Sequence, residues 1–421
     1  MIGQLFKLRA GKLAGDIRML CWRARTCTSR QSLVLGEALL QVDVEPRSVC
    51  LIQVGLRSVR SVGALLQTSQ MGAELEIGLL SAFNLATFPL IYFFTFLYYT
   101  DTVSTSLVLL MYLFHLYGHN FLSAASGFIA VTVRQTNIIW VGFILLKIVE
   151  NVLKDKAIAY KRKVTPQTLR SSKYFQILIL TIQQSWKSGF SSFSALIIDI
   201  LHESSLFIIV CLSFVTFVIW NGSIVVGDKN AHQAVLNFPQ LFYFSLFTLC
   251  FCFPYFITFT PTFFHWCVAN KKSLAIISLI CVLIVGFNTH VHPYLLADNR
   301  HYTFYIWKRV FERHFLFKYM LIPFYVFGLF AGFQILKNTS VTYCAFYIFC
   351  FMLCLVPQKL LEFRYFILPY LFLRLQIPQS SWWPLIIEFF IYTAVNALTI
   401  YLFLSRTFIW ADSPELQRFL W

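Results

Sequence analysis

Residues 273–314 read SLAIISLICVLIVGFNTHVHPYLLADNRHYTFYIWKRVFERH, an apolar run that gives way to a polar, basic and aromatic segment. The first part, 273–290, approaches the length of about 20 apolar residues that a membrane-spanning helix needs. The second part, 290–314, gathers arginine, lysine and histidine beside two carboxylates. Charges at this density next to a hydrophobic bundle are costly unless they hold a polar group such as a phosphate. The stretch predicts a charged segment at the mouth of a bundle of membrane helices.

The composition of the chain agrees with a membrane protein. Of its 421 residues, 58% are hydrophobic, 18% are aromatic and only 12% are charged. Soluble domains are about 45–50% apolar and about 25% charged. The net charge of +16 does not indicate a nucleic-acid partner. Much of the excess lies in one short interior loop and in the N-terminal tail, where lysine and arginine act as topology signals.

Apolar runs predict an all-α polytopic membrane protein, a bundle of about ten transmembrane helices. The run 121–149 is long and polar in its middle, so it could form two shorter pieces. The candidate spans are 78–98, 102–117, 121–149, 205–220, 237–259, 273–290, 318–336, 341–357, 360–376 and 384–404.

The first 76 residues differ from the rest of the chain. They hold ten lysines and arginines against six acids, and no apolar run among them is long enough to span a membrane. Their first part is rich in arginine and poor in acids, as transit peptides are. We therefore expect an atypical basic leader over 1–76 and a polytopic membrane domain over 77–421.

Charge bias sets the expected topology. The loop 150–187 is rich in lysine and arginine, which predicts that it is cytosolic. Counting spans forward places 221–236, 290–316 and 357–364 together on the opposite side. The sequon Asn221-Gly222-Ser223 on that side is consistent with the lumen of the endoplasmic reticulum and predicts glycosylation at Asn221. The basic 290–314 segment is then an exception to the rule that lysine and arginine favour the cytosolic side. It is either an interfacial amphipathic helix with an aromatic belt or an anion site.

Several polar residues within the apolar runs are candidates for a site. Glu362 and Arg364 lie two residues apart at the start of a run, and arginine suits bidentate contact with phosphate. The alternative is an internal pair that only fixes helix positions. The eleven cysteines lie mostly in apolar runs, where they behave as small hydrophobes. We expect neither a metal site nor a cofactor.

Five strings carry a resemblance: LLADNRHYTFYIWKR, VPQKLLEFRYFILPY, VRQTNIIW, NGSIVVGDKNAHQAVLNFPQLFYF and the terminal QRFLW. Together they resemble the family of dolichyl-phosphate-glucose-dependent alpha-1,2-glucosyltransferases, over about 78–421. The resemblance implies a GT-C glycosyltransferase of the endoplasmic reticulum membrane, multi-pass, with its active face in the lumen. Its donor would be dolichyl phosphate glucose and its acceptor the diglucosylated, dolichyl-diphosphate-linked oligosaccharide of N-glycosylation. Transfer would invert a beta-linked donor into an alpha linkage.

The resemblance also implies roles for particular residues. The donor phosphate would be held by Arg300, His301, Lys308, Arg309 and Arg364. Supporting positions would be Arg134, Gln135, Glu362, Tyr302 and Trp307. The aromatic side chains could stack on sugars or anchor the membrane interface, and the sequence does not separate these roles.

The general base is not assigned by the resemblance. Family members carry it in an early lumenal loop, as Asp-Glu followed by Ile-Phe-His and Pro-Gln, and residues 1–76 lack this motif. We therefore expect a divergent or truncated N-terminus. The remaining carboxylates on the same side are Asp101, Asp228 and Asp298. The alternative function is a catalytically impaired membrane protein that binds partners such as ion channels.

Overall fold

The structure, a computed structural model, describes residues 73–421 except 98, 227–233, 379–380 and 411–412. All of these residues belong to one compact unit, 51–421. The predicted basic leader, 1–76, falls almost wholly outside the described residues and stays a prediction.

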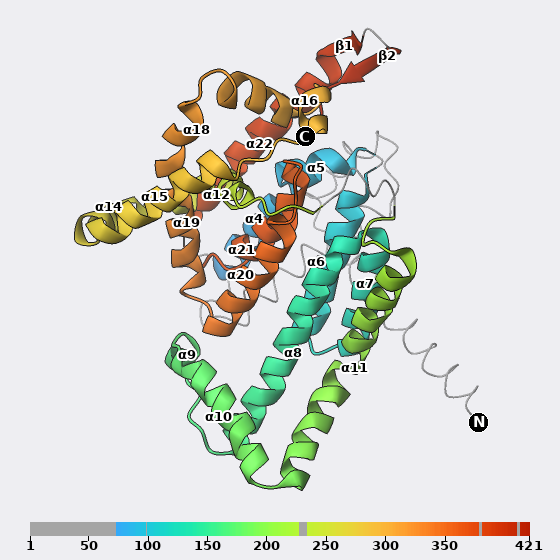
Figure 1. The fold of residues 1–421 in the computed structure, drawn as a ribbon, viewed down its shortest axis with the longest axis vertical. Helices are drawn as coiled ribbons and strands as arrows, with labels where there is room; N and C mark the ends of the chain where they lie inside the picture. The colour runs from blue at the N-terminus through green and yellow to red at the C-terminus, as the bar shows by residue number, and fades with distance from the viewer. Residues whose placement is uncertain (1–72, 98, 227–233, 379–380, 411–412) are drawn as a thin grey trace. The chain divides into compact units, whose positions relative to one another are not determined.

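Apolar helices make up most of the described chain (Figure 1). Four helical segments are long and apolar enough to cross a membrane, namely Gln135–Ala159, Phe190–Asn221, Phe317–Leu336 and Trp382–Ser405. Two pairs qualify only if each counts as one bent span. Glu76–Ala86 meets Pro89–Thr95 at 59°, and Pro239–Phe251 meets Phe253–Ala269 at 89°. The chain is thus a predominantly α-helical polytopic membrane protein with four to six candidate spans in its described residues, and the predicted ten are not confirmed.

The first half of the described chain forms helices in the predicted places, with different lengths. The predicted span 205–220 is part of a helix of 32 residues that begins at Phe190. The elements are α4 (Ala73–Ala86), α5 (Pro89–Thr95), α6 (Thr100–Leu116), α7 (Asn120–Val133), η1 (Gln135–Asn137), α8 (Ile138–Ala159), α9 (Pro166–Leu169), α10 (Lys173–Lys187) and α11 (Phe190–Asn221).

The second half contains shorter helices and ends in strands. Its elements are α12 (Pro239–Phe251), α13 (Phe253–Phe256), η2 (Ile257–Phe259), α14 (Thr260–Ala269), α15 (Lys271–Phe287), α16 (Pro293–Ala297), α17 (Tyr302–Ile306), η3 (Trp307–Phe311), α18 (Phe317–Met320), α19 (Ile322–Leu336), α20 (Val341–Leu355), η4 (Phe363–Phe366), α21 (Ile367–Arg374), α22 (Trp382–Ser405), β1 (Thr407–Trp410) and β2 (Ser413–Arg418). The strands form an antiparallel hairpin, which the prediction of an all-α fold did not include.

The predicted run 121–149 is two helices, as its polar middle allowed. Arg134 has an extended backbone, with φ −150° and ψ 114°, and this separates α7 from η1 and α8. Asn137 is buried in the break, where its side-chain amide donates to the Ser104 hydroxyl (2.8 Å) and to the Ala130 carbonyl (2.8 Å). The Ala130 carbonyl also accepts the backbone N–H of Arg134 (2.9 Å), so the Asn137 amide ties the residues after the break to the last turn of α7.

The predicted span 360–376 is wrong as a membrane-crossing helix. Its regular helix, α21, has eight residues and a length of about 12 Å, too short to cross a bilayer. All but Leu368 of these residues are buried. Two phenols satisfy its backbone, because Tyr347 donates to the Pro369 carbonyl (2.8 Å) and Tyr343 to the Phe372 carbonyl (3.0 Å). The run is apolar because protein surrounds it. A sequence pattern cannot distinguish a protein interior from a lipid environment.

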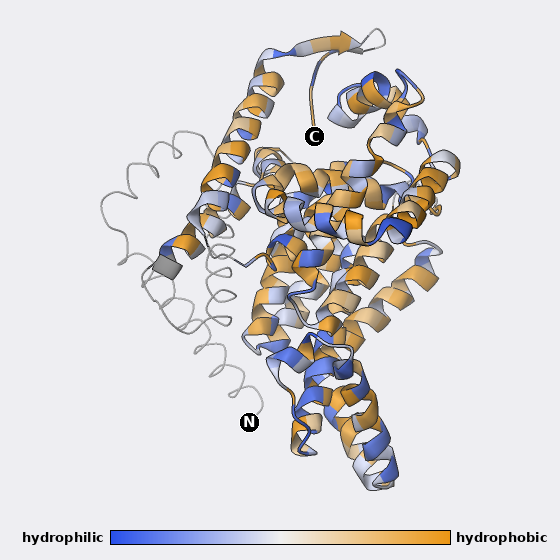
Figure 2. Cartoon of the chain, turned by 90° about the vertical axis from the view of Figure 1, so that its left-hand side faces the viewer, coloured by the Kyte–Doolittle hydropathy of each residue, from blue (hydrophilic) through white to orange (hydrophobic). Residues whose placement is uncertain are grey.

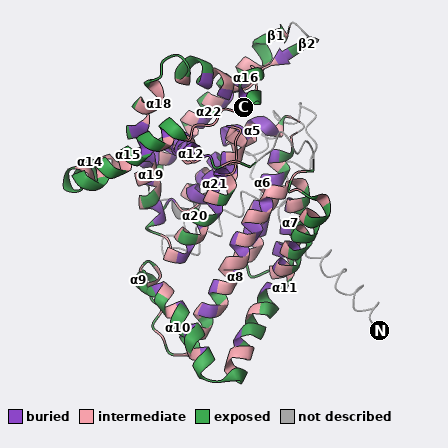
Figure 3. Ribbon diagram, viewed as in Figure 1, coloured by how far each residue is buried: buried purple, intermediate pink, exposed green. Residues whose placement is uncertain are grey.

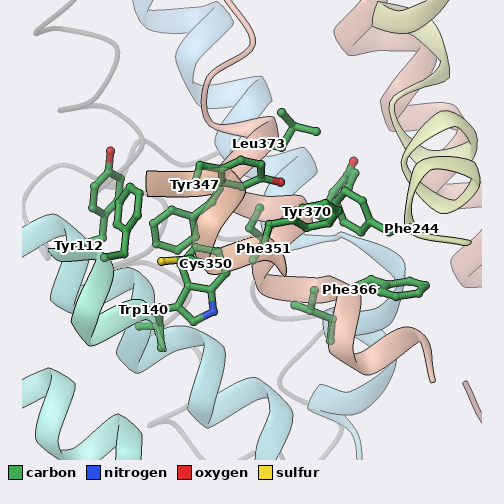
Figure 4. Close-up of a cluster of buried hydrophobic side chains, with 14 of the residues drawn as sticks. Tyr112, Trp140, Phe244, Tyr347, Cys350, Phe351, Phe366, Tyr370 and Leu373 are labelled. Atoms are coloured by element: carbon green, nitrogen blue, oxygen red, sulfur yellow. The ribbon is translucent and has the colours of Figure 1, made fainter. Parts of the chain in front are cut away.

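Aromatic side chains form the core around α21 (Figure 4). The rings of Trp140 and Phe372 stack with centroids 4.2 Å apart, and those of Phe88 and Tyr370 with centroids 4.6 Å apart. Helices α12 and α19 approach closely at Gly328, where an added Cβ would lie 2.7 Å from the Ser245 carbonyl oxygen. Small residues permit such close contacts between membrane helices.

Many large apolar side chains are exposed on the outside of the helices, and Figure 2 shows that apolar residues run along most of their length. The long helix α11 is an example, since Ile209 and Trp220 are 57% and 87% exposed. Figure 3 shows the contrast between this exposed helix and the buried α21. Exposed apolar surface on this scale is expected where lipid replaces water.

Candidate functional site

Four charged side chains from three separate segments meet at one point, which we call the two-arginine cluster: Asp101, Arg134, Glu362 and Arg364. Asp101 lies in the first turn of α6 and is only 2% exposed. One of its oxygens pairs with Arg134, at the break after α7, and the other lies 3.6 Å from Arg364 in η4. Arg364 also pairs with Glu362. The start of a helix favours a buried carboxylate, because it is the positive end of the helix dipole.

Aromatic rings fix both guanidinium groups. Arg364 lies over the ring of Tyr99 at 5.3 Å, and Arg134 lies over the ring of Tyr365 at 5.8 Å. A cation over a ring face is attracted to it, most strongly where water is excluded. The Arg134 and Arg364 side chains keep 24% and 20% of their surface exposed, so the cluster is open on one side.

A second group of charges lies in the loop between α16 and α17. Asp298 accepts from the guanidinium of Arg300 (2.7 Å) and from its backbone N–H (3.0 Å), and the ring of His301 lies 3.6 Å away. Partial burial alone would raise the pKa of Asp298. The hydrogen bonds from Arg300 outweigh burial, so the pKa of this carboxyl lies below its ordinary value.

A cavity of about 570 Å³ joins the two groups. Asp298 and His301 line it from the loop, and Glu362 lines it from the two-arginine cluster. Its wall also includes Tyr294, Asn299 and Trp410. This volume lies within the range of about 300–1,000 Å³ typical of small-molecule sites. Residues that are more than 60 positions apart in sequence therefore line one open cavity.

Among the predicted phosphate ligands, Arg300 and Arg364 pair with the lining residues Asp298 and Glu362 but do not themselves line this cavity. Lys308 and Arg309 do not line it either. Both are exposed on the π-helical turn η3. Lys308 pairs with Glu312 at 2.9 Å, and Arg309 lies over the Tyr305 ring at 5.3 Å. The turn that follows α17 carries them to the surface, which the spacing in the sequence does not reveal.

The predicted supporting residues fall into different settings. Trp307 is buried and donates to Glu312 (3.1 Å), so it packs inside the protein and is not available to stack on a sugar. Tyr302 is half-buried, with its ring centroid 5.1 Å from that of Trp421. Gln135 is half-buried in η1, next to Arg134. Asn221 ends α11, and its side chain donates to the Ser223 and Val225 carbonyls. Asp228 lies outside the described residues.

Sequence reasoning missed a fully buried ion pair, which we call the sealed pair. Arg374 donates to both oxygens of Glu388, at 2.8 and 2.7 Å, and both side chains are 0% exposed. Tyr255 and Asn84 donate to the same carboxylate, each at 2.9 Å. Each charge interrupts an apolar run, and that signal could have identified the pair.

The contribution of the C-terminal residues was also missed. Trp410 lines the cavity, and residue 420 bonds to the loop that carries Asp298. The string QRFLW was noticed as a resemblance, but no local pattern indicates which distant segment it contacts.

The fold and these charges define a class: a polytopic membrane protein with an open cluster of arginines and carboxylates beside a cavity. The chain belongs to the DIE2/ALG10 family, which it matches over residues 36–375. That match begins within the stretch predicted as a basic leader. The result supports the transferase interpretation over the alternative of a non-catalytic membrane protein.

Three relatives illustrate the similarity, and each is named Dol-P-Glc:Glc(2)Man(9)GlcNAc(2)-PP-Dol alpha-1,2-glucosyltransferase. The protein of Rattus norvegicus is 42% identical over 350 residues, which cover 82% of this chain and 73% of the relative. That of Arabidopsis thaliana is 35% identical, covering 81% and 75%. That of Drosophila melanogaster is 33% identical, covering 92% and 87%. No solved structure is significantly similar to the chain.

Proposed function

We propose that this chain transfers the terminal alpha-1,2-linked glucose from dolichyl phosphate glucose to the diglucosylated, dolichyl-diphosphate-linked oligosaccharide. Family membership and the names of relatives that are 33–42% identical support this activity. The proposal includes a GT-C arrangement of the helices and an active face in the lumen of the endoplasmic reticulum. The basic segment that carries α9 and α10 is expected in the cytosol, and it lies far from α16 in Figure 1. Because α16 lines the cavity, this separation supports a lumenal position for the cavity.

The observation that carries the proposal is the convergence of Arg134 and Arg364 beside the cavity. Arginine presents planar N–H groups that match phosphate oxygens, and both guanidinium groups are partly exposed. Lys359, three residues before Glu362, is half-buried and forms no ion pair with the described residues. It adds a positive charge that no described carboxylate offsets. We assign the phosphate of the donor to this side of the cavity, and its lipid tail to the apolar helices.

The proposed transfer forms a bond between the acceptor oxygen and the anomeric carbon of glucose. The bond from that carbon to the phosphate oxygen breaks, and dolichyl phosphate leaves with both bonding electrons. Arg134 and Arg364 would stabilise the charge that builds on the leaving phosphate. A carboxylate must take the proton of the acceptor hydroxyl. Of the candidate carboxylates in the described chain, Asp298 and Glu362 line the cavity, whereas Asp101 is held between two arginines.

Complementation tests this function. In cells that lack their own terminal glucosyltransferase, the chain should extend the diglucosylated lipid-linked glycan by one alpha-1,2-linked glucose, measured by analysis of the released glycans. Arg364→Ala should fail at an equal protein level, because it removes a guanidinium from the phosphate side. The double variant Lys308→Ala/Arg309→Ala should retain activity within about twofold, as expected for surface substitutions. Failure of the unaltered chain to extend the glycan, when it is expressed in the membrane, would contradict the proposal.

A further inference from the structure

The C-terminal hairpin, β1 and β2, is fastened to the loop that bears the second group of charges. Leu420 donates its backbone N–H to the Arg300 carbonyl (2.8 Å), and its own carbonyl accepts from the Tyr302 N–H (3.1 Å). The guanidinium of Arg300 also reaches the side chain of Gln417 in β2. In Figure 1 the hairpin lies beside α16. The hairpin is thus positioned as part of the cavity wall by residues more than 100 positions earlier in the sequence.

Trp410, at the end of β1, is held in place on two sides. Its indole N–H donates to the side-chain oxygen of Asn299 (2.6 Å), and the guanidinium of Arg300 lies over its ring at 4.8 Å. The strand register shifts between Ile409 and Trp410. Such an irregularity turns a side chain out of the regular alternation of a strand, and it occurs often next to active sites. Trp410 stays half-exposed and lines the cavity.

The lining of the cavity suits a neutral sugar better than a phosphate or a lipid tail. Two carboxylates, Asp298 and Glu362, and the amide of Asn299 can accept or donate hydrogen bonds to hydroxyl groups. No lysine or arginine of the described chain is among the lining residues, so a phosphate inside the cavity would have no guanidinium or ammonium group in its wall. A fixed aromatic ring offers a flat apolar surface to the C–H groups on one face of a pyranose, while its edge is occupied by a hydrogen bond.

We propose that Trp410 is the platform on which the terminal glucose of the acceptor glycan stacks, on the ring face that Arg300 leaves uncovered. The identity of the acceptor rests on the proposed function. The new element is the residue that binds the terminal glucose of this acceptor. Arg300 and Asn299 act as positioning residues for the indole. The hairpin thereby takes part in choosing the acceptor.

Binding of an alpha-linked glucose disaccharide to the purified, full-length protein tests the platform without requiring transfer. Saturation-transfer NMR should show contact between protein and the sugar C–H protons in the unaltered chain. Trp410→Phe should retain this contact, because it keeps a ring. Trp410→Leu, which keeps apolar bulk but has no ring, should weaken binding about tenfold, the effect of one aromatic contact of about 1.4 kcal/mol. Ile409→Ala, on the same strand and 62% exposed, is the matched control and should bind as the unaltered chain does.

The kinetic counterpart of this binding test is the KM for the lipid-linked acceptor, measured at a saturating concentration of donor. Trp410→Leu should raise this KM about tenfold and leave the donor KM unchanged. Equal disaccharide binding by the unaltered chain and Trp410→Leu, or no binding by either, would overturn the platform. A chain that binds the disaccharide through Trp410 but transfers no glucose would contradict the proposed function alone.

Discussion

The two-arginine cluster and the sealed pair use the same chemistry in opposite settings. Both join arginine to carboxylates contributed by distant segments. In the sealed pair, Arg374 and Glu388 are 0% exposed, and a neutral phenol and a neutral amide donate to the carboxylate. In the two-arginine cluster, the guanidinium groups keep about a fifth of their surface and Glu362 lines a cavity.

The comparison shows that charge inside a membrane bundle does not by itself mark a site. A buried pair with all its partners inside the protein can hold helices together and nothing else. An open pair can exchange its partners for those of a ligand. Partial exposure of Arg364 and the position of Glu362 in the cavity wall favour the phosphate-site interpretation, which stays a prediction.

The largest expected effect comes from breaking the sealed pair. Glu388→Ala leaves Arg374 as an uncompensated buried charge, which costs about 3–5 kcal/mol. We expect a large fall in the unfolding midpoint of the detergent-solubilised protein, measured by thermal denaturation, and loss of folded protein from membranes.

The double variant Arg374→Met/Glu388→Leu sharpens this prediction. Replacing both charges with apolar side chains of similar volume removes the desolvation cost together with the attraction. The double variant should therefore recover much of the stability lost in Glu388→Ala. If the two variants unfold at the same temperature, the pair is not coupled as the structure indicates.

A smaller effect is expected at Asp101, which we regard as a positioning residue for Arg134 and Arg364. Asp101→Asn should raise the KM for the donor and lower kcat about tenfold to a hundredfold, less than the loss of a general acid or base, which is worth about 10²–10⁴-fold. Asp101→Glu should recover part of the loss. The pH–rate profile is the decisive readout, because disappearance of its acid limb in Asp101→Asn would identify Asp101 as the base.

The smallest effect is expected from pH at the partly exposed Asp298. Because its folded pKa is lowered, its contact with Arg300 contributes stability above the unfolded pKa of about 4. That contribution is lost as pH falls below this value through the folded pKa. Thermal unfolding of the unaltered chain should therefore lose stability as the pH falls below about 4, and Asp298→Asn should lose less. Parallel curves for the two proteins would contradict the ion pair.

Much of this fold could be predicted from hydrophobic runs, because lipid and protein interiors both exclude polar side chains. For the same reason the prediction failed at 360–376, where α21 is apolar but surrounded by protein. The break at Arg134 was visible because a charged residue cannot lie in a lipid-facing helix without a partner.

The site was predictable in its chemistry but not in its geometry. Arg134, Glu362 and Arg364 were candidates because each interrupts an apolar run. Lys308 and Arg309 were candidates because they belong to the basic 290–314 segment and to the resemblance, yet η3 places them on the surface. Trp410 could not be found from its neighbours in sequence, because its role depends on contacts with Asn299 and Arg300 in a distant loop.

The central claim is that the two-arginine cluster acts in turnover while the sealed pair acts in folding. The most direct measurement compares two variants, Arg364→Ala and Arg374→Met/Glu388→Leu. For each variant, kcat per folded molecule and the unfolding midpoint are measured. We predict that Arg364→Ala loses about 10²–10³-fold in kcat, as for one donor to a developing negative charge, with little change in its midpoint. The double variant should retain kcat. Unchanged turnover in Arg364→Ala, together with lost turnover in the folded double variant, would contradict the account.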